Sequence, residues 1–126
     1  MNNADTDRII DEIKAERIRQ QDVEGWTPDH DDQHSKGEMT RAALNYAGAA
    51  SICMTLDANR YDQDQRPPLD FFGSAFMWPW AAKWWKPKTV RRDLIRAAAL
   101  IVAEIERLDR RAIADLSRAL PKDDGR

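Results

Sequence analysis

Apolar residues recur at three- and four-residue steps over residues 89–120, and this helical period is the feature that most constrains the fold. The stripe consists of Leu94, Ala97, Ala98, Ile101, Ile105 and Leu108. This spacing places the side chains on one side of an α-helix. Thr89 and Asp93 suit a helix start, where the helix dipole favours acids, and Pro121 stops the pattern. The pattern therefore predicts a long amphipathic helix from about Thr89 to Leu120.

Two further segments have a helical period. The first runs from about Thr6 to Asp22, with four isoleucines among charged residues, before Gly25 and Pro28 break it. Arg17, Arg19 and Gln20 near its end fit a solvated face, and the alternative is that they reach a ligand. The second segment runs from Asp31 or Ser35 to about Asp57. Small residues dominate its apolar side from Ala42 to Ala50, so a neighbouring helix can approach closely.

No segment has strict alternation long enough to predict a strand, so the expected fold class is all-α with three main helices. A length of 126 residues fits a single domain, residues 1–126, with residues 1–5 and 121–126 frayed at the ends. Three amphipathic helices cover a small core poorly. We therefore expect the bundle to be completed by homo-oligomerisation through the Ala42–Ala50 side of the second helix.

Charge and cysteine content exclude several classes of protein. The chain has 20 basic and 22 acidic residues and a net charge of −2, so no polymeric nucleic acid is expected as a partner. The single cysteine, Cys53, excludes an internal disulfide and indicates a reducing, cytoplasmic compartment. The N-terminus does not have the pattern of a signal peptide, and no apolar run is long enough to span a membrane, so no membrane partner is expected.

A loop of roughly thirty residues, from about Asn59 to Lys88, separates the second and third helices. It is rich in aromatic residues and proline, so we expect it to pack and to carry function. Indoles stack on nucleobases, and cations bind phosphates. The alternative is that the tryptophans only hold the loop against the helices. The residues predicted to bind a nucleotide are Trp78, Trp80, Trp84, Trp85, Lys86, Lys88, Arg91 and Arg92.

The stretch "HDDQHSKGE", residues 30–38, concentrates histidines and acids at the start of the second helix. If the helix begins near Asp31, then Asp31, His34 and Glu38 share one face, and Asp93 of the third helix could face them. Carboxylates suit a divalent metal such as Mg²⁺ or Mn²⁺, the cofactor expected here, and an added imidazole shifts the preference toward Mn²⁺ or Zn²⁺. The same residues also fit an ordinary helix start, because Ser35 and Glu38 match the capping box S-x-x-E.

The order of four motifs resembles a known group of proteins. "ERIRQQDVEGW", "HDDQHSKGEMTRAALNYA", "WPW…WWKP" and "RRDLIRAAALIVAEIERLDRR" follow one another within residues 8–111. This order resembles small phage and prophage proteins that are similar to the MazG-type all-α nucleoside triphosphate pyrophosphohydrolases. In that family, the motifs E-E-x-x-E and E-x-x-D bind Mg²⁺. Laid on this sequence, the first motif keeps Glu38 and has His34 and Ser35 at its earlier positions, and the second keeps Asp93 and ends at Arg96.

The resemblance implies a cytoplasmic, metal-assisted hydrolase that converts an NTP or dNTP to the monophosphate and pyrophosphate. Glu38 and Asp93 would be catalytic, and Asp31, His34, Glu38 and Asp93 would hold the metal. Because only one carboxylate of each motif remains, a non-catalytic nucleotide-binding protein, such as a phage sponge for a nucleotide signal, is the alternative. A small helical protein-interaction module is the third class.

Overall fold

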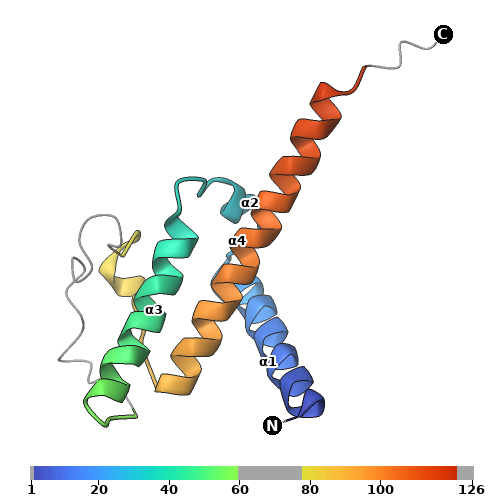
Figure 1. Ribbon diagram of the computed structural model, residues 1–126. Coiled ribbons are helices and arrows are strands. Elements are labelled where there is room, and N and C mark those ends of the chain that lie inside the picture. The colour runs from blue at the N-terminus through green and yellow to red at the C-terminus, as the bar shows by residue number, and fades with distance from the viewer. Residues whose placement is uncertain (1, 60–77, 122–126) are drawn as a thin grey trace.

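The computed structural model describes residues 2–59 and 78–121, which form four α-helices and a short 3₁₀ turn (Figure 1). No β-strand occurs among these residues, so the predicted all-α class is confirmed. None of the described helices is both long and apolar enough to cross a membrane. The elements are α1 (Asn3–Asp22), α2 (Pro28–Asp32), α3 (Glu38–Thr55), η3 (Ala82–Trp84) and α4 (Val90–Ala119).

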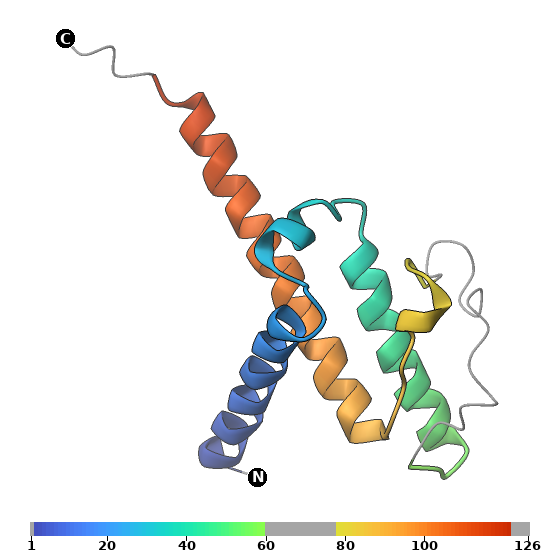
Figure 2. The same ribbon diagram turned by 180° about the vertical axis from the view of Figure 1, so that it is seen from behind.

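The centre of the molecule is an antiparallel hairpin of α3 and α4, which lie side by side in both views (Figures 1 and 2). The small residues of α3 let the two backbones approach closely, and Leu100 of α4 packs against them. The alanines at 42, 43, 49 and 50 have almost no exposed surface. The side of α3 that was expected to need a second copy is therefore covered within one chain.

The predicted start of the second helix was wrong. The chain forms the separate helix α2 after the N-cap Thr27, then turns through residues 33–37 before α3 begins at Glu38. Gly37 has a φ of +83°, a left-handed conformation that side chains rarely adopt, and this residue ends any continuous helix through the stretch. Ser35 is not the N-cap, so the capping-box interpretation was also wrong. The bounds predicted for α4, and the end predicted for α1, agree with the structure to within one residue.

Only part of the apolar stripe predicted for α4 is buried. Leu94, Ile101, Ile105 and Leu108 are each at least two-fifths exposed, whereas the buried side is centred on Leu100. α4 lies between α3 on one side and α1 on another, so contacts within the chain use two sides of the helix. The large aliphatic residues lie on the third side, which no described element covers.

Charged groups join α1 to α4. Arg17 donates to Glu106 at 3.2 Å, Arg92 of α4 donates to Glu16 at 2.5 Å, and Arg91 forms an ion pair with Glu12. Arg17 is almost fully buried, as is Gln20, so the prediction that both belong to a solvated face was wrong. The buried side of α1 is polar because its partners on α4 are polar.

Candidate functional site

Asp31, the first residue predicted to bind a metal, is fully buried and already paired. Its Oδ2 accepts a hydrogen bond from Arg17 at 2.7 Å, and its Oδ1 lies 3.1 Å from His30 Nδ1. A buried carboxylate needs such a cation to offset its lost hydration. Asp31 therefore joins α2 to α1, and the guanidinium occupies the place where a metal ion was expected.

His34 and Glu38 do not share a helix face, because the turn at Gly37 separates them. The ring of His34 lies 4.3 Å from that of His30, and its Nδ1 is 2.7 Å from the His30 carbonyl oxygen. Glu38 accepts a hydrogen bond from the backbone N–H of Lys36 at 2.5 Å. Both side chains are half-buried near the start of α3, and neither continues the buried side of that helix.

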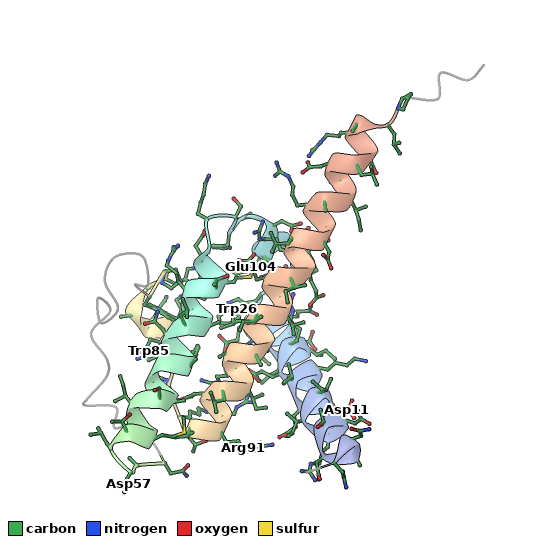
Figure 3. The ribbon with its side chains drawn as sticks, in the orientation of Figure 1. Asp11, Trp26, Asp57, Trp85, Arg91 and Glu104 are labelled. Carbon is green, nitrogen blue, oxygen red and sulfur yellow. The ribbon has the colours of Figure 1, made fainter. Side chains whose placement is uncertain are left out.

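Asp93 lies at the other end of the hairpin, in the first turn of α4. Because α3 and α4 are antiparallel, this turn lies beside the end of α3. The start of α3 instead lies beside the middle of α4, where Thr40 donates to Glu104 at 3.0 Å. Figure 3 shows this separation, with Arg91 and Asp57 at one end of the hairpin and Glu104 toward the other. The expected convergence of Asp93 with Glu38 is not found.

The four predicted ligands therefore do not form a metal site in this fold. Across residues 2–59 and 78–121, no three His, Cys, Asp or Glu side chains are grouped so that they could hold a metal ion. The prediction of bound Mg²⁺ or Mn²⁺ has no support from the positions of these residues, and no chemical step below depends on it.

Two of the four clustered tryptophans belong to the core. Trp78 and Trp85 are buried and pack on Tyr46, with ring centroids 5.7 and 4.8 Å from that of Tyr46. Lys86 donates its backbone N–H to the Tyr46 hydroxyl at 3.4 Å. These contacts hold residues 78–88 against α3, as the packing alternative predicted. The remainder of the predicted loop, residues 60–77, lies outside the described residues.

The other two tryptophans, Trp80 and Trp84, line a cavity of about 310 Å³ together with Trp26. Trp84 is 37% exposed, so its ring can be covered by a ligand. The Trp26 and Trp80 ring centroids are 5.2 Å apart. The polar side chains in this wall are Glu24 and His30. We call this cavity the tryptophan pocket. Its size and its aromatic lining with few polar groups are typical of small-molecule sites.

A tight turn after α1 places Trp26 in the pocket wall. Gly25 has a φ of +75°, and the Trp26 backbone N–H donates to the Gln20 carbonyl oxygen at 3.0 Å, which closes the end of α1. Arg17 then donates to the Trp26 carbonyl oxygen at 2.9 Å. Figure 3 shows Trp26 near the end of α1 and beside α4. One buried arginine therefore positions both Trp26 and Asp31.

His30 has a defined orientation in the pocket wall. Asp31 accepts from Nδ1 when that nitrogen carries the proton, and this arrangement leaves Nε2 as the hydrogen-bonding atom for a ligand. Glu24 has one carboxylate oxygen 3.1 Å from an Arg19 nitrogen. The pocket can therefore offer a planar ring the exposed Trp84 indole, one carboxylate and one imidazole.

Cations lie near two walls of the pocket: Arg19 is paired with Glu24, and two lysines lie beside Trp84. The Nζ atoms of Lys83 and Lys86 lie 5.3 and 5.4 Å from the centroid of the Trp84 ring. Lys88 is exposed, and its backbone N–H donates to Asp93. Arg91 and Arg92 pair with acids of α1 instead. Of the cations predicted to bind phosphate, Lys86 is the one that the structure places at the tryptophan pocket.

Sequence reasoning missed Glu24, Trp26 and His30 as members of one pocket. The signal was present in "VEGWTPDH", where a glycine precedes a tryptophan just after a helix end, but periodicity does not show which distant aromatic residues such a turn meets. Comparison of the chain with protein-family models, curated proteins and solved structures finds no match. The MazG resemblance therefore stays a prediction, and the function rests on the pocket.

Proposed function

We propose that this protein binds a nucleotide, with the base in the tryptophan pocket and the phosphates toward Lys83 and Lys86. The observation that carries the proposal is the cavity of about 310 Å³ lined by Trp26, Trp80 and Trp84. Stacking on an indole is tolerant of base identity and contributes about 1–3 kcal/mol per base. Glu24 would accept hydrogen bonds from base N–H groups.

The two lysines give the pocket the charge that a phosphate ester requires. Both are exposed and lie against the Trp84 ring, so they can reach a polar group at the pocket mouth without losing much hydration. A flexible ammonium group binds phosphate as a point charge. An uncharged nucleoside should consequently bind more weakly than its triphosphate.

Binding without hydrolysis is the form of function that the described residues support best. Hydrolysis to a monophosphate and pyrophosphate, which the resemblance implies, would need a metal centre, and the four predicted ligands are not grouped.

A nucleotide screen tests the proposal. Each NTP and dNTP is added with and without Mg²⁺ or Mn²⁺, and the melting temperature, the tryptophan fluorescence and pyrophosphate release are recorded. We expect at least one nucleotide to raise the melting temperature and quench fluorescence without any metal. Metal-dependent pyrophosphate release would instead establish the hydrolase. No response to any nucleotide would reject both and favour the protein-interaction module.

Two variants locate the site. Trp84→Ala should weaken the affinity for the nucleotide about tenfold or more, because it removes the exposed stacking face. Lys86→Gln should weaken it severalfold, with Lys88→Gln as the matched control, since Lys88 is also exposed and only two residues away but is not placed at the Trp84 ring. Equal effects of the two lysine variants would show that the phosphates lie elsewhere.

A further inference from the structure

The outward side of α4 is apolar over most of the length of the helix. Leu94, Ile101, Ile105, Leu108 and Leu116 are 43–62% exposed. Their separations of seven, four, three and eight residues keep them on one side of the helix. We call this surface the outer face. A contiguous apolar surface of this kind is uncommon on a monomeric protein, whereas scattered exposed aliphatic residues are ordinary.

The second half of α4 extends beyond the rest of the molecule. Figures 1 and 2 show it projecting past α1, α2 and α3 from both sides. Residues 111–120 are all exposed, and they include Ile113 and Leu120 in addition to Leu116. Within the part of the chain that the structure describes, nothing covers residues 112–120.

The outer face is complementary to itself when two copies of α4 run antiparallel. Along α4, residues 91, 94, 98 and 101 follow steps of three, four and three, and residues 105, 108, 112 and 115 follow the same steps. In an antiparallel pair with this spacing, the first set of one helix faces the second set of the other. Large residues then oppose small ones in the two outer apolar pairs, and two isoleucines meet in the central pair. The facing apolar pairs are Leu94 with Ala112, Ala98 with Leu108, and Ile101 with Ile105.

The same register brings opposite charges together at both ends of the contact. It places Arg91 of one copy opposite Asp115 of the other. Within one chain, Arg91 pairs with Glu12, and Asp115 pairs with Arg111 and Arg118. These pairs are exposed, so they can rearrange around a partner at little cost. A parallel pairing would place Arg91 beside its own copy and lose this match.

The area is sufficient for a reversible dimer. The contact from residue 91 to residue 115 is about 36 Å long at 1.5 Å per residue, and a third of a helix surface about 12 Å in diameter is about 13 Å wide. That gives about 450 Å² per copy, or about 900 Å² for the pair, which lies at the weak, transient end of specific interfaces. An isologous contact uses the same surface twice, as a two-fold dimer requires.

We propose that the protein forms a two-fold dimer through antiparallel pairing of the α4 outer faces, with the projecting half of each helix lying on the body of its partner. The partner is thus a second copy of this chain. This proposal is independent of nucleotide binding, because none of the residues that line the tryptophan pocket belongs to the outer face.

Sedimentation equilibrium over a concentration series tests the dimer. The chain mass is 14.5 kDa, so we expect the measured mass to rise toward twice that value as the concentration increases. Ile105→Glu should keep the mass at that of one chain. The two-fold axis repeats the contact between residues 105 and 101, so the variant would bury two glutamates against Ile101. The proposal would be overturned if the wild type keeps the mass of one chain at about 100 µM. This concentration is well above the micromolar dissociation constant that a transient contact needs.

Met54→Glu is the matched control, since Met54 is 54% exposed and Ile105 is 52% exposed, but Met54 lies near the end of α3. Circular dichroism of both variants checks that α4 is still helical. Equal loss of the dimer in the two variants would contradict the assignment of the outer face.

Disulfide formation fixes the direction of pairing. A mixture of Leu94→Cys and Ala112→Cys proteins should give a mixed disulfide, because these positions face each other. Neither variant should form a disulfide efficiently alone. A parallel dimer would reverse both results, and that outcome would overturn the antiparallel arrangement. The native Cys53 is buried and does not compete.

Discussion

Asp31 and Asp93 are both fully buried, but their surroundings differ. Asp31, beneath the tryptophan pocket, accepts from the Arg17 guanidinium at 2.7 Å and has His30 at its other oxygen. Asp93 accepts one hydrogen bond at Oδ1, from the backbone N–H of Lys88 at 2.8 Å, and its Oδ2 has no hydrogen-bond partner among the described residues. Burial raises the pKa of the Asp93 carboxyl, against the opposing effects of that N–H and of Arg96.

Asp31 is part of a network that stabilises the fold, whereas Asp93 is buried without such a network. Arg17 bonds Asp31, Trp26 and Glu106, which belong to three segments of the chain. Removing one partner of such a buried network leaves an uncompensated charge. Asp93 has the favourable dipole of a helix start, but it connects fewer elements. The four predictions that follow test this contrast, from the largest expected effect to the smallest.

Arg17→Met should lower the free energy of unfolding by about 3–5 kcal/mol, because it leaves Asp31 buried without its cation. Urea unfolding followed by circular dichroism measures the change. Arg91→Met is the control, since it removes an exposed ion pair between the same two helices and should have a much smaller effect. The double variant Arg17→Met/Asp31→Leu should recover part of the loss. Equal losses for Arg17→Met and Arg91→Met would refute the contrast.

Asp31→Asn should lower the free energy of unfolding by about 2 kcal/mol, since the Arg17 guanidinium then bonds a neutral amide in place of a carboxylate. It should also weaken nucleotide binding, because Asp31 orients His30. Calorimetry with the nucleotide found in the screen measures the affinity. An affinity equal to that of the wild type would show that His30 does not contact the ligand.

Asp93→Asn should change the free energy of unfolding by less than about 1 kcal/mol at neutral pH. The amide keeps the acceptor for the Lys88 N–H and removes a charge that burial disfavours, while its new N–H groups lack acceptors. Nucleotide affinity should not change, because Asp93 lies away from the pocket. A loss as large as that of Asp31→Asn would show that the two aspartates have equal structural roles.

The pH dependence of Asp93 should have the opposite sign to that of Glu16. A carboxyl with a raised pKa binds its proton more tightly in the folded state, so wild type should gain stability relative to Asp93→Asn as pH falls from neutral toward 3.8. Burial tends to raise the pKa of Glu16, but Arg19 and Arg92 outweigh it and lower that pKa. Wild type should therefore lose stability relative to Glu16→Gln as pH falls. Urea unfolding at several pH values measures both differences, and slopes of the same sign would contradict the two assignments.

Periodicity predicted the length and limits of α4 well, because caps and spacing are local properties. It did not predict which side of α4 is buried. The spacing of Leu94, Ile101 and Ile105 identifies an apolar side, but what covers that side depends on where α1 and α3 dock. The break before α3 was missed because a glycine in "SKGE" is compatible with either a helix or a left-handed turn.

The sequence also predicted only part of the candidate site, because local patterns do not show which distant side chains meet. Aromatic and basic residues near Trp84 indicated a planar, anionic ligand, and Trp80, Trp84 and Lys86 do lie at one pocket. Composition could not distinguish these from Trp78 and Trp85, which differ only in packing against Tyr46. Three of the four predicted metal ligands, Asp31, His34 and Glu38, were assigned from a helix register that the turn at Gly37 disrupts.

The bond between Arg17 and Glu106 joins residues 89 positions apart, and it has a consequence for the order of folding. α1 is synthesised before α4, yet several of its partners lie on α4. At about 5–20 residues per second, α1 waits between about 4 and 18 seconds on the ribosome before Glu106 is added. A helix with a large apolar side would be prone to aggregate during this interval. The fully buried side chains of α1 are Glu16, Arg17 and Gln20, polar groups that water can hydrate before α4 forms.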